Sequence, residues 1–127
     1  MNKCFKFNKY VELGKVFKDC EAYLIALENF DKALELSYLP INKNLIVEVY
    51  DLRGNTKILL SRYRDAIIDY NKAIEIEPQN AYLFFWRGFA FESMKEYRKA
   101  IDDLSISLRL DPDFFLAKSL LEHIENK

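Results

Sequence analysis

The sequence predicts an all-α fold, a solenoid of three helix-turn-helix repeats closed by one C-terminal helix. Two observations lead to this prediction. The residues that follow Gly54 and Gly88 recur at the same offsets from each glycine. After Gly54 they are Tyr63, Ala66, Tyr70, Ala73 and Pro78, and after Gly88 they are Tyr97, Ala100, Leu104, Ser107 and Pro112. Apolar residues at helical spacing also run through each glycine, which indicates helices rather than turns there.

A third copy of the unit precedes these two. The same offsets from Gly14 give Tyr23, Ala26, Phe30 and Ala33, whereas the proline has moved to Pro40. Glycine inside a helix costs about 1 kcal/mol relative to alanine, so three of them in register indicate a close crossing of helices. We expect alanines opposite the glycines and large rings at the wider ends of the hairpins. These are Ala26, Ala66 and Ala100, and Phe17, Phe30, Tyr70 and Phe91.

This order of aromatic residues, glycine, alanines and proline resembles the tetratricopeptide repeat, a helix-turn-helix unit whose period matches the interval from Gly54 to Gly88. The resemblance implies a right-handed α-solenoid that forms one domain, 1–127, with repeats at about 7–40, 47–80 and 81–112 and a capping helix at about 113–126. Two features depart from the pattern. Arg53 and Arg87 stand where the family has leucine before its glycine, and Leu104 and Ser107 replace an aromatic residue and an alanine.

Each repeat should contain two helices. The hydrophobic periodicity places them at about 6–19 and 21–37, 45–60 and 63–76, and 81–94 and 97–110. Asn80 and Asp111 are candidate N-caps, the latter with Pro112 at the first helical position. The six extra residues between the first two copies imply a longer connection or an earlier start of the next helix, capped by Asn42 or Asn44. This insertion is either a tolerated loop or a contact site.

The last residues suit one amphipathic helix that covers the open end of the third repeat, as solenoids require. Its apolar side would be Phe114, Ala117, Leu121 and Ile124, and its polar side Lys118, Glu122 and Glu125. We expect no matching cap at the N-terminus. Exposed apolar residues there, Phe5, Phe7 and Val11, could support a homodimer through the first repeat, which light scattering of Phe7→Glu or Val11→Glu would test.

Composition narrows the classes of partner. The formal charge of -1 and pI near 5.9 argue against a generic nucleic-acid binder. The lysines near the N-terminus form either a solvated helix face or an anion-binding strip, so an RNA-associated adaptor stays open. Cys4 and Cys20 form no metal motif, and neither a signal peptide nor a membrane span is visible. We therefore expect a reduced, cytoplasmic protein.

Catalysis has little support in the sequence. His123 is the only histidine, and it lies among charged residues of the capping helix. Asp102 and Asp103 are adjacent in a helix and point about 100° apart. Phosphate-binding glycine loops and metal-ligand spacings are absent from the sequence. We expect no enzyme activity, no cofactor and no metal.

The resemblance implies instead a scaffold that binds a peptide or helix of another protein in a concave groove lined by the first helix of each repeat. Carried over by register, the groove residues fall into three sets. They are Asn8, Val11, Lys15 and Lys18; Glu48, Asp51, Asn55 and Ile58; and Tyr82, Phe85 and Phe89.

The same register indicates that this chain does not belong to one subtype of the family. In that subtype, a clamp of lysine, asparagine and arginine holds the acidic C-terminal tails of heat-shock chaperones. The corresponding positions hold Val11, Lys15, Leu52, Tyr82 and Trp86, and only Asn55 resembles a clamp residue. We expect no meaningful affinity for such tails.

The stretch 81–94 carries six aromatic residues, more than one packing stripe needs. Tyr82, Phe85 and Phe89 lie three and four positions apart on a face that would line the groove. Either these rings are buried by neighbouring helices, or Phe85 and Phe89 anchor an apolar partner segment beside Glu48 and Asp51. In the second case, truncation of each ring should cost about 2 kcal/mol of binding and leave the fold intact.

Overall fold

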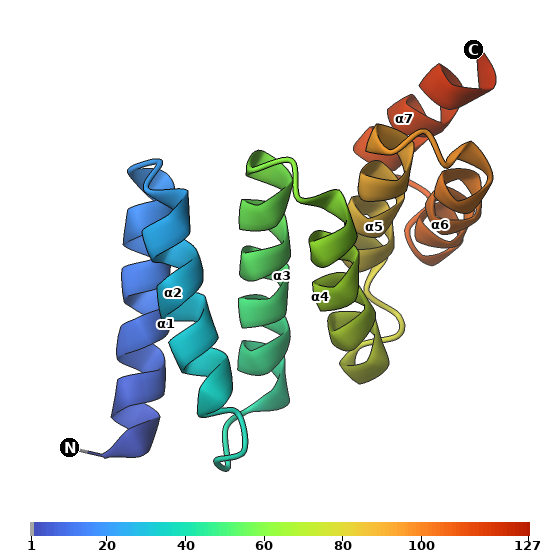
Figure 1. The fold of residues 1–127 in the computed structure, drawn as a ribbon. Coiled ribbons are helices and arrows are strands. Elements are labelled where there is room, and N and C mark those ends of the chain that lie inside the picture. The colour runs from blue at the N-terminus through green and yellow to red at the C-terminus, as the bar shows by residue number, and fades with distance from the viewer. Residues whose placement is uncertain (1) are drawn as a thin grey trace.

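The computed structural model describes residues 2–127, which form seven α-helices and no strand. The helices pair into three hairpins, and a single helix follows them (Figure 1). In chain order the helices are α1 Lys3–Asp19, α2 Tyr23–Glu35, α3 Lys43–Leu59, α4 Tyr63–Ile76, α5 Ala81–Ser93, α6 Tyr97–Leu110 and α7 Phe115–Glu125. The hairpins stand in a row with the chain ends at opposite ends of it. The predicted all-α repeat fold is confirmed.

The glycines are the close-contact points of the hairpins, as predicted, but the nearest groups against them are not the alanines. The rings of Phe30 and Tyr70, expected at the wider ends, lie directly against Gly14 and Gly54 because only a residue without a side chain leaves room for a ring there. A methyl group added to Gly54 would lie 2.9 Å from Cζ of Tyr70, and one added to Gly14 would overlap the Phe30 ring. At Gly88 the nearest atom would be Leu104 Cγ, at 3.2 Å. Because leucine is shorter than an aromatic ring, the third hairpin crosses with slightly more room than the other two.

The turn inside each hairpin contains a residue with positive φ that is not glycine. Glu21, Ser61 and Lys95 have φ of 62°, 59° and 63°. At Ser61, the backbone amide donates to the carbonyl of Ile58, and the next amide donates to that of Lys57, which is the Schellman pattern at a helix C-terminus. The other two turns repeat these bonds. The sequence pattern contains no sign of this conformation because glycine is its usual marker.

The six extra residues between the first two repeats both lengthen the connection and let the next helix start earlier. Helix α3 begins at Lys43, earlier than 45, and the Asn42 side chain caps it by accepting a hydrogen bond from the Asn44 amide at 2.8 Å. The connection 36–42 is also longer than the connection 77–80. Leu36 and Ile41 from it pack against the core of the first repeat, so this loop is partly structural.

The predicted cap at Asp111 is wrong. Its carboxylate accepts a hydrogen bond from the Asp113 amide at 3.2 Å, which closes a turn, and α7 starts only at Phe115. This turn places the Phe114 side chain in the core, where it is buried with Ala117 and Ile124. The capping helix therefore covers the third hairpin as predicted, but from a later start.

The expectation that Phe7 and Val11 are exposed is also wrong. Both side chains are buried against Phe30 and Ala33 in the core of the first repeat. Phe5, on a different side of α1, remains exposed. Glutamate at residue 7 or 11 would unfold the hairpin, so those variants cannot test self-association.

The row of hairpins has an inner and an outer side. The first helices approach one another, α1 with α3, α3 with α5 and α5 with α7, whereas no two second helices meet within the described residues. The first helices and α7 therefore line the inner side of the row. The second helices spread apart on the outer side.

Candidate protein-binding groove

We call the inner face of α1, α3, α5 and α7 the groove. Its N-terminal half is polar and internally paired. Lys15 Nζ lies 2.7 Å from Glu48 and 3.3 Å from Glu12. The hydrogen bond to Glu48 is the main cause of the raised pKa of Lys15. Two of the predicted site residues are thus occupied by each other, and Lys15 offers little unpaired charge to a ligand.

Asp51 lies next to this pair and is incompletely satisfied. Its Oδ1 atom is buried and has no hydrogen-bond partner within the described residues. Burial raises the pKa of Asp51 to about 6, Lys18 opposes that rise, and Glu48 adds to it. The floor of the groove therefore contains a carboxylate that accepts a proton more readily than an exposed one does.

Asn55 lies one turn further along α3, and a hydrogen bond from a core residue holds its side chain in place. The Tyr70 hydroxyl, which comes from the core, donates to Asn55 Oδ1. Burial strongly raises the pKa of Tyr70, so the hydroxyl keeps its proton and stays a donor. The Nδ2 amide of Asn55 is thereby left as the donor on the groove side. Ile58, by contrast, packs against the core cluster that contains Tyr70.

The C-terminal half of the groove is aromatic, and the burial of its rings differs from the prediction. Tyr82 is 60% exposed, with its ring 4.7 Å from that of Phe114. Phe85 is 5% exposed and packs between Phe114 and Trp86, at centroid distances of 5.1 and 5.0 Å. The expectation that Phe85 lies on an open face is wrong, because the turn before α7 places Phe114 over it.

The accessible apolar residues at this end include Tyr82, the half-buried Phe89 and Leu116, and the neighbouring Phe115 is 74% exposed. Leu116 occupies in α7 the position that Tyr82 occupies in α5, one repeat earlier, and is 54% exposed. Leu116 is absent from the predicted site residues, because α7 was expected only to cover the end of the third repeat. Continuation of the repeat register into α7 would have placed it.

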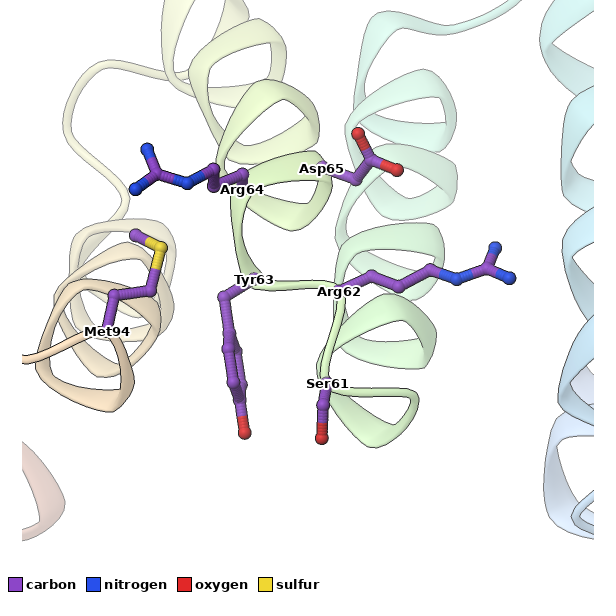
Figure 2. A pocket seen from close by; sticks show the side chains of 6 residues that line it. All are labelled: Ser61, Arg62, Tyr63, Arg64, Asp65 and Met94. Carbon is purple, nitrogen blue, oxygen red and sulfur yellow. The ribbon is translucent and has the colours of Figure 1, made fainter.

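A second hollow lies away from the groove. Ser61, Arg62, Tyr63, Arg64, Asp65 and Met94 line about 430 Å³ of open space at the α3–α4 turn (Figure 2). The two arginine side chains point in opposite directions there. Because the two arginines point apart, they do not form an anion-binding site in this hollow.

The described residues contain no group of three or more histidine, cysteine or acidic side chains that could hold a metal ion. His123 is exposed on α7. None of the described helices combines the length and the apolar character that crossing a membrane requires.

Known proteins share this architecture. A family model described as TPR repeat, the tetratricopeptide repeat, matches residues 54–95. Residues 54–95 are therefore tetratricopeptide repeats, and the whole array has the fold of such repeats. The TPR domain of Arabidopsis OM64 superposes with a TM-score of 0.87 at 22% identity over 98% of both chains. The second TPR domain of human RPAP3, solved with the HSP70 peptide SGPTIEEVD, gives 0.87 at 19% identity and covers 99% of this chain and 100% of that chain.

Among curated proteins, Sperm-associated antigen 1 of Rattus norvegicus is 33% identical over 78 residues. The match covers 61% of this chain and 9% of the rat protein, so the chain spans a small part of that relative. The tetratricopeptide repeat is a protein-interaction fold, which agrees with the predicted class of function.

The clamp positions of this tetratricopeptide array hold no free set of cations. Val11 is buried, and Leu52 and Trp86 pack against core clusters. Lys15 is the one cation among the five positions, and its ammonium is paired with two carboxylates. These positions therefore offer one paired cation rather than a cluster of free ones.

Proposed function

We propose that this chain is a protein-interaction scaffold whose groove binds an extended or helical segment of another protein. The segment places an apolar side chain on Tyr82, Phe89 and Leu116 and its polar groups over Asp51 and Asn55. Cytoplasmic residence is part of the proposal, supported by the free cysteines Cys4 and Cys20. No catalytic step is assigned to any residue.

The exposed aromatic end of the groove is the observation that carries the proposal. Tyr82 in α5 and Leu116 in α7 occupy equivalent repeat positions, and each exposes more than half of its side chain. Equivalent positions in a repeat point to the same side of the array, so we assign both to the inner face. Phe85 and Phe114 form a rigid buried base beneath them. Rigid aromatic surface of this kind loses little side-chain entropy on binding and is typical of interface hot spots.

The polar half adds selectivity against acidic tails. A ligand carboxylate near Asp51 would meet a second carboxylate, and Lys15 would have to leave Glu48 to reach it. We therefore propose that the groove does not bind chaperone tails, although the RPAP3 domain of the same fold was solved with one.

The groove can be tested by comparing variants of inner and outer residues. Tyr82→Ala with Leu116→Ala alters the groove, and Leu24→Ala with Ile68→Ala removes apolar side chains of similar exposure from the second helices. Each protein is immobilised and exposed to a native cell extract, and captured proteins are identified by mass spectrometry. We expect a partner that the wild type and the outer variant capture and the groove variant loses by tenfold or more. Equal capture by both variants would refute the groove.

The acidic-tail prediction has its own measurement. Titration calorimetry with the peptide SGPTIEEVD should show no heat of binding in the micromolar range. A dissociation constant in that range would overturn the assignment of the polar half.

A further inference from the structure

The outward face of α1 is unpaired within the described residues. It lies opposite the buried side of the helix, and Phe5, Asn8, Lys9, Glu12, Leu13 and Val16 line a hollow of about 370 Å³ on it. Phe5 and Val16 are 57% and 55% exposed. This face adjoins the groove, and Asn8 is the residue that the two share.

In the other two repeats, the corresponding face packs against the preceding hairpin. The residue that matches Lys9 is Val49 in α3 and Leu83 in α5, and both are buried in core clusters. The residue that matches Glu12 is Leu52 or Trp86, which pack beside them. A further hairpin of the same kind stacked on α1 would bury a lysine and a glutamate against apolar side chains. Such a contact is unfavourable.

The unpaired face is complementary to itself. Phe5, Lys9, Glu12 and Val16 follow one another at intervals of four, three and four positions, the spacing of one seam of a coiled coil. Read in either direction, the seam runs apolar, charged, charged, apolar. When two such helices lie antiparallel, Phe5 of each meets Val16 of the other, and Lys9 meets Glu12.

We propose that a second copy of this chain docks on this face, with the two α1 helices antiparallel about a two-fold axis between Lys9 and Glu12. The apolar layers at both ends bury Phe5 and Val16. The two central ion pairs fix the register, since any other register sets a charge against an apolar group. The contact of Lys15 with Glu12 is exposed and contributes little, so Glu12 is available to the second copy.

One helix pair with four layers buries less surface than a permanent dimer does, so the association is weak and depends on concentration. The aliphatic stems of Lys9 and Glu12 cover the apolar layers while their charged ends meet. None of the four seam residues is among the predicted groove residues of α1, and Asn8 alone belongs to both the groove set and the lining of this hollow.

Charge reversal tests this arrangement by sedimentation velocity. Lys9→Glu places two glutamates against two glutamates, and Glu12→Lys places lysines against lysines. We expect the wild type to associate reversibly and each single variant to stay monomeric. An equimolar mixture of the two variants should associate, because every contact then joins opposite charges. The double variant Lys9→Glu, Glu12→Lys should associate like the wild type.

The control is Lys6→Glu, which makes the same charge change at an exposed residue of α1 outside the seam and should associate like the wild type. Far-UV circular dichroism checks that every variant is folded. A wild type that is monomeric up to about 1 mM would overturn the proposal. So would a mixture that fails to associate, or a Lys6→Glu variant that dissociates as the seam variants do.

Discussion

The Arg53 guanidinium donates to both carboxylate oxygens of Asp69, at 2.6 to 3.1 Å, although the Asp69 side chain is 1% exposed. The same guanidinium reaches Asp31 of the preceding hairpin at 2.8 Å. Arg87 repeats the arrangement one repeat later with Asp103 and Asn71. The arginines that replace the usual leucine thus join each hairpin to its predecessor.

Removal of one partner of this pair should be costly. Asp69→Ala removes the main counter-charge of the partly buried Arg53 and also the partner of Lys57, whose ammonium lies 3.0 Å from Asp69. We expect a loss of about 3 kcal/mol of unfolding free energy. The first repeat has Leu13 and Asn29 at the two positions. The double variant Arg53→Leu, Asp69→Asn copies that pair and should recover part of the loss, because Arg53 no longer needs a carboxylate whereas Lys57 still lacks one. Urea denaturation of the three proteins decides this, and a double variant no better than Asp69→Ala would contradict it.

The glycine crossings should differ in their tolerance of a methyl group. Gly54→Ala pushes against the Tyr70 ring, and overpacking of this kind costs about 1–3 kcal/mol. Gly88→Ala meets the side chain of Leu104 with more space, and the gain in helix propensity of about 1 kcal/mol offsets the contact. Thermal melts should therefore show a lower midpoint for the first variant and little change for the second. Equal losses of melting midpoint in the two variants would mean that the Tyr70 ring does not determine how well a crossing tolerates a methyl group.

The positive-φ turn residues offer a route to higher stability. Ser61→Gly removes the steric cost of the left-handed conformation, and we expect a gain of about 1 kcal/mol. Arg62→Gly is the matched control, because Arg62 has φ of -92° and glycine there only adds freedom to the unfolded chain. Chemical denaturation should move the two midpoints in opposite directions.

Asp51 should make stability depend on pH. Its folded pKa of about 6 exceeds the ordinary 3.8, so between these values the folded protein binds more protons than the unfolded chain. Stability therefore falls as pH rises through this window. Asp51→Asn should be more stable than wild type above pH 7, by at most about 3 kcal/mol, and equal to it near pH 3. The exposed Asp102→Asn is the control and should show no such difference.

Two neighbouring rings of α5 should separate packing from binding. Phe85→Ala empties a buried site against Phe114 and should cost about 3–5 kcal/mol of stability. Tyr82→Ala removes a mostly exposed ring and should leave the melting temperature within a few degrees of the wild type. If Phe85→Ala melts like the wild type, the ring is not part of the core.

The repeat register could be predicted from the sequence because it depends on short-range rules. Glycine, alanine and ring positions recur wherever two helices cross closely, so the hairpins and their order follow from spacing alone. Helices α4 and α6 span the predicted residues 63–76 and 97–110. The inner side chains could be listed for the same reason, since a helix repeats its faces about every 3.6 residues.

Tertiary contacts decided which of those side chains are accessible. Phe85 is buried because Phe114, from the turn beyond the next helix of the chain, lies against it, and no local pattern encodes that contact. The charge of Lys15 is paired with that of Glu48 from the next repeat. The pKa of Asp51 is raised because the packing of α1 and α3 excludes water from its carboxylate. The sequence by itself determined the array and its faces. Exposure and charge balance depend on atoms that only the folded chain brings together.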